Sequence, residues 1–355
     1  MKTIRNLDLK DKTILMRVDY NVPLKNGKVA DDLRIRSSLP TINYLLEKGA
    51  KKIILLSHLG RPDGQENLEF SLSPVADTLR KLLPEQKHIG FYPLPEKGKS
   101  IIDYYDKPDL KVILLENLRF DPGEEANSPE FIKNIIDSTG ANIYVQDGFA
   151  VVHRAHASTD AVAKFLPIYT GFLVEKEAEN LTKVLENPEH PVLLIIGGSK
   201  VDDKQPLIDK FSTIADQIFV GGKIAADGYK ANNPKIYVSE DFDEDASGAK
   251  LDIGPVSTAK LADYVKDAKT IIWNGLLGKA EDPAYATAST IAAKLVGEKE
   301  DATTIICGGD TTGFVENLMK DNKDLSYSLI STGGGAALEF LVGKELPGLK
   351  VIKRA

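Results

Sequence analysis

Cysteine is nearly absent from this chain, since Cys307 is the only one among 355 residues. A single thiol excludes a disulfide framework and a cysteine-rich zinc site. Long apolar runs are also lacking, and the longest, such as "PVLLII" at 191–196, are far too short to span a bilayer. The first residues, "MKTIRNLDLKDK", carry scattered charges and no apolar core of the signal-peptide type. We therefore expect a cytoplasmic protein with no membrane partner.

Positive charge is not in excess either. The net charge is −7 and the isoelectric point is near 5.4, which argues against a nucleic-acid partner. The chain is 42% hydrophobic and 27% charged and has no low-complexity tract, so its composition is that of a folded protein with room for two domains. Any basic site must therefore be local, set into an acidic surface.

Short apolar runs typical of buried strands alternate with helical patterns along the whole chain. The runs are 13–22, 52–59, 111–118, 142–149, 191–198, 217–222, 235–241, 270–275, 303–309 and 327–335, and the helical patterns include 33–50, 128–140, 206–216 and 257–268. This alternation predicts an α/β fold with two doubly wound parallel-sheet, Rossmann-like domains facing a cleft. The amphipathic stretch 173–187 would be the helix that joins them.

The strands of the two halves end in different residues. Polar side chains end the first-half strands, and glycines end most second-half strands: Asp19, Asn21, His58, Arg61, Glu116, Arg119 and Asp147, against glycines at 197–198, 221–222, 308–309 and 333–335. The carboxyl ends of parallel strands form the edge of the sheet where such folds bind ligands. We therefore expect a binding site in each half, with different chemistry.

Arginines and histidines gather near the strand ends of the first half. They are Arg34, Arg61, Arg119 and Arg154, with His58, His153 and His156. The planar guanidinium group binds carboxylate or phosphate through two hydrogen bonds. Several arginines at one sheet edge would bind a small, multiply charged anion. Spacing alone leaves open the alternative that these are ordinary surface arginines in salt bridges.

His153 and His156, in "HRAHAS", stand three residues apart and would suit a metal pair. No cysteine or carboxylate stands at a suitable spacing to complete a zinc site. We therefore favour a polar turn with one histidine packed inside.

The glycine-terminated strands indicate phosphate binding, because backbone N–H groups at helix N-termini hold phosphates and glycine allows close approach. "CGGDTTG" adds Asp310, an oxygen ligand suited to Mg²⁺, and "GGSKVDDK" adds Lys200 and Lys204. No Walker A motif and no G-x-G-x-x-G is present. Tight-turn packing would explain any one glycine pair. Together with the arginines, the glycine loops favour a phosphoryl-transfer enzyme with a nucleotide–Mg²⁺ site.

A series of motifs resembles phosphoglycerate kinase, in the order of that family. They are "RVDYNVP", "LRIRSSLPTI", "SHLGRP", "ENLRF", "HRAHAST", "GGSKVDDK", "LDIGP", "WNG", "GGDT" and "STGGGAALEFLVGKELPG". The resemblance runs from the N-terminus to the last few residues. It implies reversible Mg²⁺-dependent phosphoryl transfer between 1,3-bisphosphoglycerate and ADP, giving 3-phosphoglycerate and ATP, with closure about a hinge. Nothing in the sequence demands more than a monomer.

The resemblance also implies a division of the chain. Residues 1–170, with a C-terminal tail at 340–355, would bind 3-phosphoglycerate. Residues 171–188 would form the interdomain helix, and residues 189–339 would bind the nucleotide.

Site residues follow from the matched motifs. The implied substrate residues are Asp19, Asn21, Arg34, His58, Arg61, Arg119 and Arg154. The implied nucleotide residues are Gly198, Lys204, Gly221, Gly222, Asn274, Glu281, Gly308, Gly309, Asp310 and Thr311, with Asp310 as the Mg²⁺ ligand and Glu281 as the ribose-binding carboxylate. Catalysis would depend on Arg34, Lys200, Gly309 and Gly334.

The segment around 223–250 is much shorter than its counterpart in the family, and we expect one helix from Ile224 to about Lys230 and a strand at 235–240. Several residues also depart from the pattern: Lys223, Ile224, Leu276, Lys279, Ala280, Cys307 and Leu329. A trimmed but working kinase explains these departures, because the charged positions survive. Two alternatives stay open: a kinase with altered nucleotide preference, and a silent relative that binds phosphoglycerate or nucleotide for regulation.

Overall fold

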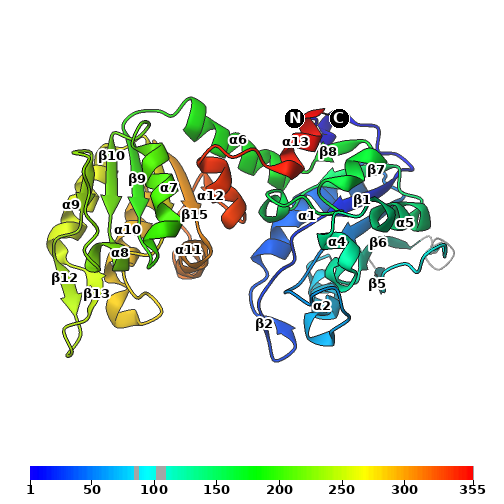
Figure 1. Ribbon diagram of the computed structural model, residues 1–355, viewed down its shortest axis with the longest axis horizontal. Coiled ribbons are helices and arrows are strands. Elements are labelled where there is room, and N and C mark those ends of the chain that lie inside the picture. The colour runs from blue at the N-terminus through cyan, green and yellow to red at the C-terminus, as the bar shows by residue number, and fades with distance from the viewer. Residues whose placement is uncertain (84–87, 101–108, 355) are drawn as a thin grey trace. The chain divides into compact units, whose positions relative to one another are not determined.

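The computed structural model describes residues 1–83, 88–100 and 109–354, and the chain divides into two compact units. The first comprises residues 1–176 and 345–355, and the second comprises residues 177–344. Each contains a six-stranded sheet in which all paired strands run parallel, with helices around it (Figure 1). The two sheets confirm the predicted fold class.

The sheet of the first unit has the strand order β5-β6-β4-β1-β7-β8. Its strands are β1 (Thr13–Arg17), β4 (Lys52–Leu56), β5 (His88–Tyr92), β6 (Leu110–Leu115), β7 (Ile143–Gln146) and β8 (Ile168–Thr170). The helices are α1 (Leu33–Glu47), α2 (Ser73–Leu82), α4 (Pro122–Glu125), α5 (Pro129–Thr139) and α13 (Pro347–Arg354). Short 3₁₀ helices are η1 (Ile4–Asn6), η2 (Leu68–Phe70), η3 (Leu118–Phe120), η4 (Phe149–Val151) and η5 (Ala161–Lys164), and β2 (Leu24–Lys25) pairs with β3 (Lys28–Val29).

The second unit has the strand order β11-β10-β9-β14-β15-β16. These strands are β9 (Val192–Ile196), β10 (Gln217–Val220), β11 (Ile236–Val238), β14 (Thr270–Asn274), β15 (Thr303–Cys307) and β16 (Leu329–Ile330), and β12 (Phe242–Glu244) forms an antiparallel pair with β13 (Lys250–Ile253). The helices are α7 (Val201–Phe211), α8 (Gly222–Ala226), α9 (Pro255–Asp267), α10 (Thr287–Gly297), α11 (Gly309–Asp321), α12 (Gly335–Leu341) and the 3₁₀ helix η6 (Pro283–Tyr285). Helix α6 (Phe172–Glu186) carries the chain from the first unit into the second.

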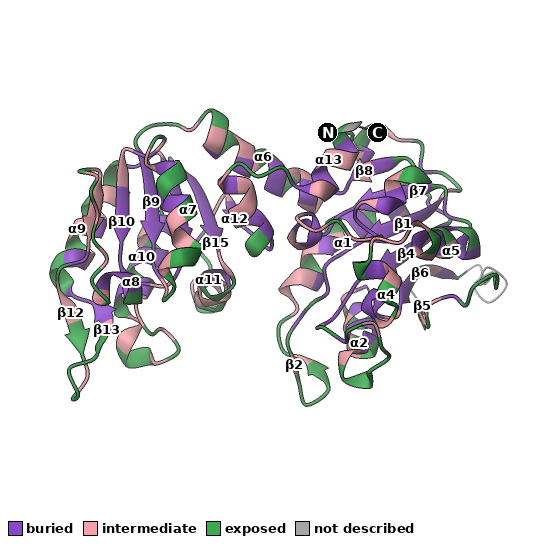
Figure 2. Ribbon diagram, in the orientation of Figure 1, coloured by how far each residue is buried: buried purple, intermediate pink, exposed green. Residues whose placement is uncertain are grey.

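The central strands form the cores, as the apolar runs predict. Every residue of β1, β4, β9, β14 and β15 is buried (Figure 2). The strands are shorter than the predicted runs, because the polar residues and glycines at the end of each run lie beyond the hydrogen-bonded part of the sheet. Strands β5 and β8, at the two edges of the first sheet, had no sequence signal that we recognised.

Helix ends follow local chemistry. Ser128 begins α5 by accepting a hydrogen bond from the Phe131 N–H at 3.3 Å, and Gly140 ends it in the left-handed region with φ of 63°. The stretch 128–140 was predicted as a helix ending in glycine, and this prediction is confirmed.

The shortened segment holds less helix than expected. The prediction of a helix from Ile224 to about Lys230 is wrong, because α8 ends at Ala226 and Gly228 turns the chain with φ of 86°. The following strand is Ile236–Val238 and not 235–240. Strand β11 nevertheless pairs in parallel with β10, so this short connection still completes the sheet edge.

The C-terminal residues return to the first unit. The Gly348 N–H donates to the Val152 carbonyl at 2.9 Å, and a Cβ at Gly348 would lie 2.9 Å from the Val152 Cα, so only glycine fits there. Residues 340–344, expected in this tail, lie with the second unit, and Ala355 lies outside the described residues. Within the described ranges, no helix has the length and apolar character needed to cross a membrane.

The buried carboxylate of Glu177 joins α6 to the loop that precedes α12. It accepts hydrogen bonds from the Ser331 hydroxyl at 2.6 Å, the Thr332 N–H at 2.8 Å and the Thr332 hydroxyl at 2.7 Å. This places the start of the glycine-rich stretch 333–335 against α6.

We expect Glu177→Ala to lower the free energy of unfolding by about 3 kcal/mol, because three buried donors lose a charged acceptor. Urea unfolding would measure this loss. Glu179→Ala, at an exposed position of the same helix, is the matched control. Equal stability of the two variants would contradict the prediction.

Candidate active site

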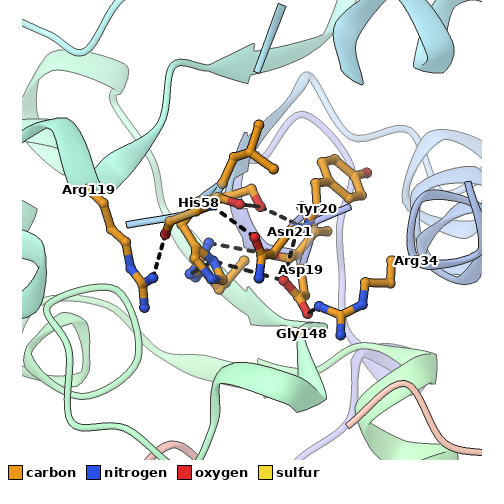
Figure 3. A network of polar contacts seen from close by, with 12 residues as sticks. Asp19, Tyr20, Asn21, Arg34, His58, Arg119 and Gly148 are labelled. Atoms are coloured by element: carbon orange, nitrogen blue, oxygen red, sulfur yellow. Dashed lines mark hydrogen bonds and ion pairs between the residues drawn. The ribbon is translucent and has the colours of Figure 1, made fainter. Parts of the chain in front are cut away.

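Asp19 and Asn21 leave β1 at the carboxyl edge of the first sheet and hold two neighbouring segments (Figure 3). The Asp19 carboxylate is buried, forms an ion pair through Oδ2 with Arg34 of α1, and accepts the Asn21 N–H through Oδ1 at 3.1 Å. The Asn21 side chain accepts the Gly60 N–H at 2.9 Å. Asp19 therefore orients Arg34, and Asn21 ties the loop after β1 to the loop after β4.

His58 follows β4 and lies among arginines. Its Nδ1 is 3.1 Å from Nη2 of Arg17 and 3.9 Å from Oδ1 of Asp19. Burial lowers the pKa of His58 well below its ordinary value, and the positive charges of nearby guanidinium groups lower that pKa further: Arg17, Arg119, Arg34 and Arg154. The structure thus brings three of the predicted arginines within electrostatic reach of one imidazole.

The predicted arginines differ in exposure. The Arg119 guanidinium is buried, donates to the Gly60 carbonyl at 2.8 Å and pairs with Glu125 at 3.1 Å, and burial lowers its pKa. Arg154 donates through Nε to Nε2 of His153 at 3.2 Å. Arg61 is exposed after β4. Such a group of cations can hold an anion at one sheet edge. The cations that stay in contact with water carry a smaller desolvation cost than the buried one.

The stretch 153–158 forms a turn anchored by Glu124. The buried Glu124 carboxylate accepts the Ser158 N–H at 3.0 Å and the Ser158 hydroxyl at 2.6 Å. Burial raises the pKa of Glu124, although the charge of Arg17 opposes that rise. His156 packs beside it, with Nδ1 at 3.9 Å from a Glu124 oxygen. The turn that carries Arg154 is therefore held from beneath by a carboxylate.

Arg17 and Glu124 are residues that the sequence reasoning missed. Both are almost completely buried, and both face the arginine and histidine group. Arg17 stands inside the apolar run "TILMRV", and this was a usable signal. Arginine is rarely buried unless it has partners, so an arginine in a buried strand indicates a polar group nearby. Glu124 lies in the four-residue helix α4 and gave no comparable signal.

The second unit contains a cavity of about 590 Å³ at the carboxyl ends of its strands. Predicted residues that line it are Gly198, Lys200, Lys204, Glu281, Gly308, Gly309, Asp310 and Thr311. Further lining residues are Ser199, Asp203, Lys223, Leu251, Gly275, Leu276, Gly278 and Lys279. Four lysines and the first turns of α7 and α11 therefore share one cavity, which favours a polyanion.

Several predicted residues do not line this cavity: Asn274, Gly221, Gly222 and Gly334. Asn274 is buried beneath it and bonds through Oδ1 to the Lys204 ammonium, so it positions that lysine. Burial lowers the pKa of Lys204. Thr311 accepts the Gly275 N–H at 2.8 Å and so also fixes a loop.

The glycines serve two purposes. A Cβ at Gly197 would lie 2.2 Å from the Leu276 carbonyl oxygen, and one at Gly275 would lie 2.2 Å from the Gly197 oxygen, so these glycines allow loops to pack. Gly308 has φ of 94°, a region that other residues rarely adopt. Gly309, in contrast, has open space where a Cβ would point. Tight packing therefore explains Gly197 after β9 and Gly275 after β14. Gly309, at the start of α11, has no such packing role and is available to a ligand.

Asp310 in the first turn of α11 is the predicted metal ligand. Across the described ranges, no cluster of three or more histidine, cysteine, aspartate or glutamate side chains could hold a metal. A single carboxylate beside lysines fits a divalent cation that arrives on phosphate oxygens, because Mg²⁺ is commonly bound by one or two carboxylates plus substrate phosphates.

Comparison with known proteins gives a family model that matches most of the chain. The family model described as phosphoglycerate kinase matches residues 4–247 and 227–344. The two matched ranges overlap within the segment 223–250 that the sequence analysis singled out.

Relatives resemble this chain over nearly its whole length. Phosphoglycerate kinases of Dictyoglomus turgidum and Moorella thermoacetica are each 39% identical to it, over 99% and 98% of this chain and 98% of each relative. The solved phosphoglycerate kinase of Coxiella burnetii is 34% identical with a TM-score of 0.80, and that of Pyrococcus horikoshii is 26% identical with a TM-score of 0.86. Both structures cover 99% of this chain and 98% of their own.

The pKa of His156 leads to a prediction about acid stability. Burial, followed by the charges of Arg119 and Arg17, lowers that pKa from 6.5 to about 4. The unfolded chain therefore binds the proton more tightly, and the folded state loses stability as the pH falls from about 6.5 toward about 4. We expect His156→Gln to remove about 2 kcal/mol of the stability difference between pH 7 and pH 4.5.

Urea unfolding of wild type and variant at both pH values would measure this effect. His190→Gln, at an exposed histidine, controls for loss of an imidazole as such. If wild type and His156→Gln lost equal stability on acidification, the assignment to His156 would be wrong.

Proposed function

This chain belongs to the phosphoglycerate kinase family, and we propose that its two units bind 3-phosphoglycerate and the nucleotide respectively. The enzyme is a phosphotransferase whose acceptor is a carboxyl group, and the comparisons give no support to a silent relative or to an altered nucleotide preference. The observation that carries the division of roles is chemical. Arginines gather in the first unit, whereas lysines and a glycine-bordered cavity lie in the second.

In the first unit, we assign 3-phosphoglycerate to the group around His58. Arg34, Arg61, Arg119 and Arg154 would bind its charges, because guanidinium groups match both phosphate and carboxylate. Asp19 and Asn21 would bind or orient the uncharged part of the substrate. The ion pair between Asp19 and Arg34 supports a role for Arg34 close to the reacting carboxyl group, because a held guanidinium loses less freedom on binding.

In the second unit, we assign the nucleotide phosphates to Lys200, Lys204 and the N–H groups at the start of α11. The buried position of Lys204 and its bond to Asn274 support a fixed ammonium in the cavity. Glu281 would bind the ribose, and Leu251 and Leu276 would flank the base. For Gly221, Gly222 and Gly334 the resemblance is the only support for a role, since they do not line the cavity.

The chemistry needs no general base. The carboxylate of 3-phosphoglycerate is already ionised at neutral pH, and in reverse the terminal phosphate of ADP attacks. The protein contributes by positioning both substrates and by offsetting negative charge on the transferred phosphoryl group, for which we assign Arg34, Lys200 and the N–H groups near Gly309 and Gly334. When bound, Mg²⁺ on the nucleotide phosphates would neutralise further charge, with Asp310 as its protein ligand.

The family resemblance also supports a monomer of the cytoplasm whose units close over the substrates. Closure would exclude water, which otherwise hydrolyses the acyl phosphate product.

We expect wild type to transfer phosphate from ATP to 3-phosphoglycerate with Mg²⁺, measured by coupling to reduction of the acyl phosphate. Asp310→Ala should lower kcat by about 100-fold or more, because the cation loses its protein ligand. Asp321→Ala, at the far end of α11, is the matched control and should keep wild-type activity. A folded wild type that binds 3-phosphoglycerate but shows no turnover would refute the kinase assignment.

Thermal unfolding tests the division of substrates between the units. A ligand that binds only the folded state stabilises it by RT ln(1 + [L]/Kd), so each ligand reports on its own site. Arg34→Met should abolish the shift caused by 3-phosphoglycerate and keep the shift caused by MgADP. Lys204→Met should give the opposite pattern. Loss of both shifts in both variants would contradict separate sites.

A further inference from the structure

We propose that Arg17 is a positioning residue that holds His58 in its neutral form with the ring proton on Nε2, so that this N–H donates to the phosphorylated substrate. The ligand in this statement rests on the proposed function. The state of His58 itself rests on the geometry of the first unit.

The guanidinium of Arg17 is buried and is held through its two terminal nitrogens, while its Nε has no hydrogen-bond partner among the described residues. It is 1% exposed, and its Nη1 donates to the carbonyl oxygens of Val18 and Leu56, both at 3.2 Å. These two bonds orient the group, and they direct Nη2 at Nδ1 of His58, 3.1 Å away. The contact is therefore built by the ends of β1 and β4 and does not depend on a mobile surface chain.

Donor and acceptor roles follow from the chemistry of the pair. Arginine has only N–H donors and stays charged in proteins, so Nδ1 of His58 must supply the lone pair. The single proton of a neutral imidazole then lies on Nε2. A proton on Nδ1 would lose this bond and bring two donors together at 3.1 Å, which disfavours both the other tautomer and the imidazolium.

The charges that face His58 act in the same direction. Arg34, Arg119 and Arg154 add positive charge from α1, η3 and the turn at 153–158, beside Arg17 from β1. Among the described residues, the one carboxylate contact of the His58 ring is with Oδ1 of Asp19, at 3.9 Å from Nδ1, which is too long for a hydrogen bond. Oδ2 of Asp19 is already paired with Arg34, so this single carboxylate offsets only part of the charge of the four arginines.

The other ring nitrogen is left for a ligand. Every hydrogen bond or ion pair between the His58 side chain and the described part of the chain is made through Nδ1. An Nε2–H beside these arginines can donate to a phosphate or carboxylate oxygen. Because the ring is neutral, it adds a directed hydrogen bond without adding a further buried positive charge to the site.

Long-range ¹H–¹⁵N NMR of the histidine rings tests this inference on the intact protein. His58→Gln identifies the His58 signals. We expect wild type to show the Nε2–H tautomer at pH 6 and 7, and 3-phosphoglycerate to shift the Nε2 signal. Arg17→Met, which is close in volume and uncharged, should yield a mixture with Nδ1–H or imidazolium. It should also raise KM for 3-phosphoglycerate about tenfold with little change in kcat.

The control is Arg36→Met, which removes an exposed arginine of α1 and should leave the tautomer and KM unchanged. An Nδ1–H or imidazolium signal in wild type at pH 7 would overturn the proposal, and so would an unchanged tautomer in folded Arg17→Met. If Arg17→Met does not fold, the tautomer seen in the wild-type spectrum still tests the proposal. Turnover is read separately, so an Nε2–H ring in an inactive protein would refute the kinase function and retain the assignment of His58.

Discussion

Strand register is the constraint on which both sites depend. In the first unit Arg17 of β1 lies level with Leu56 of β4 and Gln146 of β7, so the segments after these strands start at one edge. In the second unit Asn274 of β14 lies level with Ile196 of β9 and Cys307 of β15. A slip of one residue would turn every side chain to the opposite face and separate the groups that the sites need.

Buried charge is the main energetic cost of the first site. Arg17, Glu124 and Arg119 are removed from water, and each is held by carbonyls, hydroxyls or an opposite charge. These partners make such burial tolerable, but Nε of Arg17 has no hydrogen-bond partner among the described residues, and the arginines still repel one another. An anion that binds among them relieves this repulsion, which is a physical reason for a site of this composition to bind a multiply charged ligand.

The second site tolerates a shortened chain because of where the shortening lies. Its cavity is built mainly by the loops after β9, β14 and β15 in the middle of the sheet, and the first two of these loops pack at Gly197 and Gly275 with no space for a side chain. The reduced segment leads to β11 at the sheet edge. The close packing of the central loops is therefore kept, although the segment that leads to the edge strand β11 is shorter.

The sequence by itself determined the fold class, the helix 128–140, the central strands and the two kinds of strand end, because apolar periodicity and glycine or proline punctuation act locally. It could not determine that Arg17 reaches His58, that Glu124 holds the turn at 153–158, or that Asn274 lies beneath Lys204 and outside the cavity. Those contacts join segments far apart in the chain, and only the parallel register brings them together. The end of α8 and the edge strands β5 and β8 were also decided by tertiary context, since short segments carry too few residues for a clear pattern.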